Sequence, residues 1–97
     1  MSNIHEWFTD EETILIKNLL VAVTNAVPET GPTTADQWRQ VNPDPANLYI
    51  VGEPTADSVR YQFVHIPDTR IEATRLPNGN VDARAICATP EGDQRLF

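Results

Sequence analysis

The chain has 97 residues, the length of one ordinary domain, with 40% hydrophobic and 22% charged residues. These proportions are typical of a globular chain and exclude a disordered or fibrous protein, so a single domain over 1–97 is expected. Seven Lys and Arg against 14 Asp and Glu give a net charge of −7 at pH 7. The charge disfavours direct binding to nucleic acid or to anionic lipid, because both are negative.

The compartment is indicated by the cysteine content and by the N-terminal segment. Cys87 is the single cysteine, so the intramolecular disulfides on which small secreted domains depend are excluded. The segment before Thr13 is acidic rather than basic, which is not typical of a signal peptide. The longest apolar run, Leu19–Val23, is much shorter than the roughly 20 residues that span a bilayer. We therefore expect a soluble, cytoplasmic protein.

A long helix is predicted over Asp10–Val27. Thr9 and Glu12 have the spacing of a capping box, in which each side chain bonds the backbone amide of the other residue. Three acidic residues in the first turn lie at the positive end of the helix dipole. Pro28 ends the pattern. Ten apolar residues between Ile14 and Val27 form more than one stripe, so this helix is expected to be the central packing element.

The surplus of apolar side chains on this helix has two interpretations. A homodimer through the long helix would cover them, and we prefer this prediction because a symmetric dimer is the commonest arrangement of that kind. Alternatively, several aromatic and apolar residues from both ends of the chain fold back over the helix and complete a monomeric core. These residues are Trp7, Phe8, Trp38 and Leu96–Phe97.

A short second helix and a set of strands follow. Thr34 and Gln37 form a second capping box, and the prolines at 43 and 45 end that helix. Asn78-Gly79 predicts a two-residue type I′ turn with positive φ at both residues. The tail Thr89–Phe97 is expected to be irregular. The alternation of polar and apolar residues predicts four strands: Leu48–Gly52, Ser58–Ile66, Arg70–Leu76 and Val81–Ala88.

The order of these elements predicts an α+β domain. One long N-terminal helix packs on a four-strand antiparallel meander, with a short second helix between them. The order is similar to that of the cystatin-like plan, in which a sheet clasps one long helix. The inhibitory motifs of that family are not present in this sequence, so the resemblance implies a fold plan and no function.

The residues that carry reactive chemistry are few. His5 and His65 are the two histidines and Cys87 the one thiol, and their spacing is not that of a metal site. His65 is in phase with Tyr61, which predicts a hydrogen-bonded histidine at the edge of the core. Cys87 is in phase with Ala85, which predicts a buried small hydrophobic residue. With no Gly-x-Ser-x-Gly motif and no phosphate loop, we expect no enzyme, no metal and no cofactor.

The polar face of the predicted sheet is the most informative feature. Opposite charges on adjacent strands stabilise a sheet by at most about 1 kcal/mol, and a solvated charge ladder is the simpler explanation. The competing explanation is a binding face, since arginine is favoured at the centres of interfaces and lysine is not. The predicted partner-binding residues are Arg60, Gln62, Glu72, Asp82 and Arg84.

The functional hypothesis is a small acidic, non-catalytic protein-binding module: an inhibitor, an immunity-type neutraliser, a chaperone or an assembly subunit. A charge of −7 speeds encounter with a basic partner, including a nucleic-acid-handling protein. One alternative is a small-ligand-binding protein or small enzyme, with a pocket between helix and sheet whose polar groups are His65, Tyr61 and an arginine. Another is a structural homo-oligomer.

Overall fold

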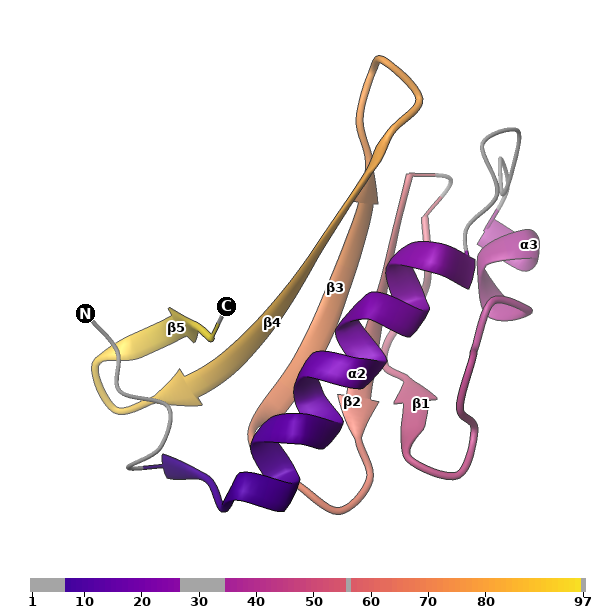
Figure 1. The fold of residues 1–97 in the computed structure, drawn as a ribbon. Helices are drawn as coiled ribbons and strands as arrows, with labels where there is room; N and C mark the ends of the chain where they lie inside the picture. The colour runs from indigo at the N-terminus through magenta and orange to yellow at the C-terminus, as the bar shows by residue number, and fades with distance from the viewer. Residues whose placement is uncertain (1–6, 27–34, 56, 97) are drawn as a thin grey trace.

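The computed structural model describes residues 7–26, 35–55 and 57–96, and it confirms the α+β class (Figure 1). In the described part of the chain the helices precede the strands, as the sequence predicts. In chain order the elements are α2 (Asp10–Ala26), α3 (Ala35–Arg39), β1 (Leu48–Ile50), β2 (Ser58–Phe63), β3 (Thr69–Arg75), β4 (Val81–Thr89) and β5 (Gly92–Arg95).

The strands form one antiparallel sheet in the order β1-β2-β3-β4-β5, which is a simple meander. The predicted strand count of four was wrong, because the tail forms β5 instead of an irregular segment. Thr89 lies opposite Gly92, and Ile86 lies opposite Arg95. Gly92 has a φ of +113°, a conformation that glycine adopts without steric cost. The chain therefore reverses directly after β4 and adds a fifth strand at the edge.

Helix α2 lies across the sheet and packs mainly on β4 and β3 (Figure 1). Ile16, Leu19 and Val23 are buried, and their spacing places them on one helix face. The capping box is confirmed: the Thr9 amide donates to Glu12 Oε1 at 2.9 Å, and the Glu12 amide donates to Thr9 Oγ1 at 3.1 Å. The predicted end at Val27 and Pro28 lies outside the described residues, as does the second N-cap, Thr34.

The core lies between α2 and one side of the sheet, which we call the inner face. Trp38 from α3 is fully buried there, and Leu96 closes the core beyond β5. Burial of Cys87 was predicted correctly. The opposite side of the sheet is called the outer face. The buried strand residues of the inner face are Leu48, Val59, Tyr61, Phe63, Thr69, Ile71, Ala73, Ala85 and Cys87.

The predicted position of His65 at the core edge was wrong. Strand β2 ends at Phe63, three residues before the predicted end at Ile66. Because the extended backbone stops there, the alternation of period two does not continue. His65 is exposed, and Ile66 is buried in its place. Strand β1 is also shorter than predicted, ending at Ile50 rather than Gly52.

The turn between β3 and β4 is a hairpin, but not the predicted type I′ turn. The Gly79 amide donates to the Leu76 carbonyl at 2.9 Å, and the Leu76 amide donates to the Asn80 carbonyl at 2.7 Å. Gly79 has a φ of +88°, whereas Asn78 does not have a positive φ. Pro77 has a φ near −65°, which suits the second position of a type I turn. The loop is therefore a type I turn followed by a left-handed glycine, a common three-residue hairpin.

The aromatic residues divide between core and surface. Trp38 is buried and Phe8 packs partly buried against the core, as the alternative of a monomeric core expects. Trp7 is 41% exposed and does not close the core as that alternative expects. The apolar surplus of α2 is also smaller than expected, because its large exposed side chains are Ile14 at 60% and Val21 at 52%.

Candidate functional site on the outer face of the sheet

The strand register brings the predicted partner-binding residues to the outer face. Arg60 lies opposite Glu72, and Glu72 lies opposite Arg84 on the next strand. Gln62 lies opposite Arg70, and Asp82 lies opposite Thr74. All five predicted residues therefore share this face, as their alternation with buried residues requires.

An ion-pair network crosses the outer face from β2 to β5. Arg60 Nε lies 3.4 Å from Glu72 Oε1, and Arg70 Nε lies 3.4 Å from the other oxygen of the same carboxylate. Arg70 Nη2 donates to Asp93 Oδ2 at 2.7 Å. We call Arg60, Glu72, Arg70 and Asp93 the outer-face network. Asp82 and Arg84 form a separate pair within β4, with Nε and Oδ2 2.9 Å apart.

Arg70 is the centre of this network, although it was not among the predicted site residues. Its side chain is 23% exposed, against 65% for Arg60, because it lies between Gln62 and Ile86 in the middle of the sheet. The hydrogen bond to Asp93 raises the pKa of Arg70, and the charge of Glu72 raises it further. Burial acts in the opposite direction and lowers it. The same hydrogen bond and the Arg70 charge lower the pKa of Asp93.

The Nε atom of Arg70 is buried without a hydrogen bond and has an ion-pair contact with Glu72. Asp93 was missed because it lies in the tail that was predicted to be irregular. Arg70 could have been predicted, since it is two residues before Glu72 on the same strand and therefore on the same face.

Apolar side chains border the network at the β1 edge. Tyr49 is 51% exposed and lies opposite Gln62 on the outer face. Val51 follows two residues later, and its amide donates to the Arg60 carbonyl at 3.0 Å. Val64, beyond the end of β2, is also exposed. The outer face thus combines arginine and tyrosine, and exposed valines lie just beyond the ends of β1 and β2.

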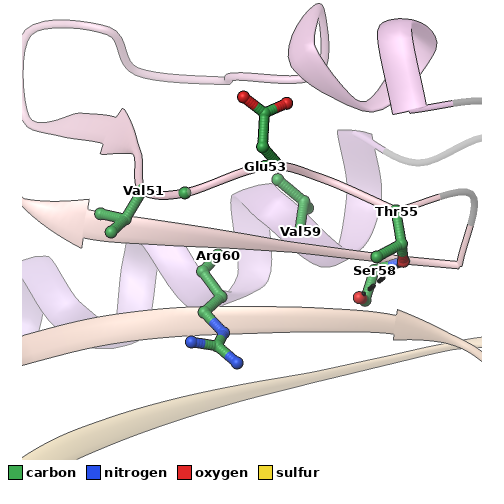
Figure 2. A pocket seen from close by; sticks show the side chains of 7 residues that line it. Val51, Glu53, Thr55, Ser58, Val59 and Arg60 are labelled. Carbon is green, nitrogen blue, oxygen red and sulfur yellow. Dashed lines mark hydrogen bonds between the residues drawn. The ribbon is translucent and has the colours of Figure 1, made fainter.

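A small pocket lies at the same edge, where the segment between β1 and β2 returns to the sheet (Figure 2). Its volume is about 210 Å³. The side chains of Thr55, Ser58 and Arg60 point to one side of β2, whereas that of Glu53 points away from them. The lining residues are Val51, Gly52, Glu53, Thr55, Ser58, Val59 and Arg60.

Charge is divided unequally between the outer face and the rest of the chain. The outer face carries four arginines, at 60, 70, 84 and 95, and three carboxylates, at 72, 82 and 93. Its balance is therefore +1. Since the whole chain carries −7, the remainder carries −8. The net negative charge of the protein therefore comes from residues other than these seven.

The other groups considered from the sequence are not brought together. The Tyr61 hydroxyl is buried and donates to the Val41 carbonyl, while His65 is exposed beyond the end of β2. Within residues 7–26, 35–55 and 57–96 there is no cluster of three or more His, Cys, Asp or Glu side chains that could hold a metal ion. No helix in that part of the chain is long and apolar enough to cross a membrane.

The chain shows no significant match to a protein-family model, a curated protein or a solved structure.

Proposed function

We propose that this protein is a non-catalytic protein-binding module and that the outer face of the sheet is its docking surface. The observation that carries the proposal is the outer-face network, held on a side of the sheet away from the core and from α2 (Figure 1). Arginine and tyrosine are the side chains most typical of interface centres, and both occur here. The network holds its side chains in place before binding, which lowers the entropic cost of association.

A solvated charge ladder explains this face less well. An exposed ion pair loses little hydration when it forms, and it typically contributes about 0 to 1 kcal/mol to the stability of the fold. Arg70 and Glu72 are 23% and 26% exposed, so both groups are largely removed from water. Partly buried charges cost desolvation energy, and Arg70 Nε does not recover this through a hydrogen bond. A surface that only had to be soluble would not need this arrangement.

The partner is proposed to be a protein with a basic surface surrounding its contact site. The −8 charge outside the outer face would attract such a protein from a distance, while the near-neutral outer face makes the contact. This division of charge is consistent with each of four roles: inhibitor, immunity-type neutraliser, chaperone or assembly subunit. Attraction of this kind weakens as salt is added, because the charges are screened.

The proposal is tested by capture from the native cell extract at low and high salt. Three baits are compared: the unchanged chain, Glu72→Lys in the centre of the outer face, and Glu91→Lys in the turn between β4 and β5, which makes the same charge change. We expect one stoichiometric protein with the first and third baits and its loss with Glu72→Lys. Thermal melting by circular dichroism checks that all three are folded.

Two results would overturn the proposal. Equal capture by all three baits would place the contact elsewhere on the molecule. Absence of a protein partner, together with a small molecule retained in native mass spectrometry, would favour the ligand-binding alternative.

Self-association through α2 is a second candidate, favoured by a single observation. Ile14 and Val21 are 60% and 52% exposed, and their spacing of seven residues places them on one helix stripe. A second copy would cover this stripe. Sedimentation equilibrium at micromolar concentration tests it, with Val21→Lys as the disrupting variant. A single species near 10.8 kDa for the unchanged chain would exclude the dimer.

A further inference from the structure

We propose that the pocket beside Arg60 is a carboxylate-binding subsite of the docking surface. It takes an Asp or Glu side chain, or the C-terminal carboxylate, of the partner protein. This inference rests on the proposed function and adds the chemistry of the partner's anchor. Its grounds are the donor groups around the pocket, their orientation, its size and the local charge.

The hydroxyl pair at the pocket has a defined direction. Thr55 Oγ1 accepts from the amide of Asp57 at 3.2 Å and from the amide of Ser58 at 3.0 Å. A hydroxyl oxygen has two lone pairs, so Thr55 has none left to accept a third hydrogen bond. Its contact with Ser58 Oγ, at 3.0 Å, must therefore be a donation from Thr55. The hydrogen of the Ser58 hydroxyl is then available, and among the described residues it has no acceptor.

Arg60 supplies the second donor. It is two residues from Ser58 on β2, so both side chains are on the same side of the strand, as Figure 2 shows. Its Nε is paired with Glu72, while its side chain is 65% exposed. The terminal nitrogens of the guanidinium carry four of its five donor hydrogens and match the two oxygens of a carboxylate. A carboxylate at this place can accept from Arg60 with one oxygen and from Ser58 with the other.

The guanidinium of Arg60 favours an anion over a neutral acceptor. Glu72 meets Arg60 at Nε and also contacts Arg70, so the terminal nitrogens of Arg60 can donate to a second carboxylate. Glu53 also lines the pocket, but its carboxylate points away from Arg60 and Ser58 (Figure 2) and interacts with another group. A carboxylate offers two charged oxygens to the planar guanidinium, whereas a neutral carbonyl offers one uncharged oxygen and a weaker hydrogen bond.

The size of the pocket fits one side chain. Its volume of about 210 Å³ is below the 300 to 1,000 Å³ that is typical of sites for small-molecule ligands. Val51 forms one wall, and Tyr49, two residues before it in β1, lies on the outer face. The residue next to the partner's carboxylate would therefore contact an apolar surface.

The test uses three blocked peptide probes, followed by NMR of the ¹⁵N-labelled protein. The first, acetyl-Ala-Ala-Glu-Ala-Ala-amide, offers a side-chain carboxylate. The second, acetyl-Ala-Ala-Ala-Ala with a free C-terminus, offers a terminal carboxylate. The third replaces Glu in the first peptide by Gln and is neutral. We expect saturable shifts at the amides of Gly52, Ser58 and Arg60 for at least one carboxylate peptide, with Kd in the millimolar range expected of a single contact.

Variants assign the shifts to the pocket. Arg60→Gln and Ser58→Ala are each expected to weaken binding of the carboxylate peptide by about threefold to tenfold, which is the effect of one typical lost hydrogen bond. Lys17→Gln on α2 makes the same charge change as Arg60→Gln and should leave the Kd unchanged. Equal shifts with the neutral Gln peptide, equal weakening by Lys17→Gln, or no saturable shift with either carboxylate peptide would each overturn the inference.

The captured partner separates this inference from the proposed function. Loss of the partner with both Arg60→Gln and Glu72→Lys supports both proposals. Loss with Glu72→Lys alone overturns the carboxylate subsite and leaves the docking surface standing. Retention with both variants overturns the docking surface, while the peptide titration still decides whether the pocket binds a carboxylate.

Discussion

The inner and outer faces of the sheet are made from the same strands and differ in the surroundings of each side chain. On the inner face, Ile71 lies opposite Tyr61 and Ala85, and all three are fully buried. The next residue, Glu72, lies opposite Arg60 and Arg84 and stays partly exposed. One peptide bond therefore separates the hydrophobic core from the candidate docking surface. We expect the inner face to determine stability and the outer face to determine binding.

The largest expected effect is on the inner face. Ile71→Ala removes fully buried apolar volume and should lower the free energy of unfolding by about 2 to 5 kcal/mol. Glu72→Ala, its neighbour on the outer face, should lower it by less, about 1 kcal/mol, because no core volume is lost and Arg70 keeps its hydrogen bond to Asp93. Urea denaturation of the two variants measures the difference. Equal losses would show that the two faces do not divide these roles.

A second prediction uses the hydroxyl of Tyr61. Burial raises the pKa of Tyr61 to about 12 from the ordinary value of 10.0. Because the pKa is higher in the folded state, the protonated hydroxyl stabilises the fold at pH values below the unfolded-state pKa of 10.0. This stability is lost as the pH rises from 10 to about 12. Tyr61→Phe should cost about 1 to 3 kcal/mol at neutral pH, because the Val41 carbonyl loses its donor. It should also remove part of the decline in stability at alkaline pH.

Tyr49→Phe on the outer face is the matched control for Tyr61→Phe. Tyr49 is 51% exposed, so its substitution should leave the stability at neutral pH unchanged. Equal losses of stability in the two variants, measured by thermal melting at neutral pH, would contradict the assignment of the Tyr61 hydrogen bond.

The third prediction concerns the hairpin that sets the register between β3 and β4, and hence which residues share a face. Gly79→Val should cost about 1 kcal/mol or more, because it forces a branched side chain into a left-handed conformation. Asn78→Ala should cost less, since Asn78 does not have a positive φ. A type I′ turn would instead penalise both substitutions. Denaturation midpoints of the two variants decide between the turn types.

The smallest expected effect is in the outer-face network. The hydrogen bond from Arg70 keeps the pKa of Asp93 below its ordinary value. Arg70→Gln should return the Asp93 pKa toward that value, which NMR titration of the carboxyl group measures. Because the folded-state pKa of Asp93 is lowered, its contribution to stability is present near neutral pH and is lost as the pH falls. An unchanged pKa in Arg70→Gln would mean that the pair does not persist in solution.

Two turns of similar sequence show where prediction from the sequence ended. Leu76–Gly79 and Thr89–Gly92 both have proline at the second position and a glycine with positive φ at the fourth. The first was predicted as a hairpin because alternating apolar residues flank it. The second was missed because β5 has the sequence Gly-Asp-Gln-Arg and carries no apolar alternation. Backbone pairing with β4 and the Arg70–Asp93 ion pair hold this strand instead.

The helix start, the meander order and the placement of the five predicted residues on one face could be predicted from the sequence alone. These features depend on local capping and on side-chain periods, which can be read along the chain. Other features depend on tertiary contacts: the central position of Arg70, the addition of Asp93 to the network, the exposure of His65 and the pocket at Arg60. Each of these depends on where a strand ends or on which distant segments pair, and neighbours along the chain do not determine such contacts.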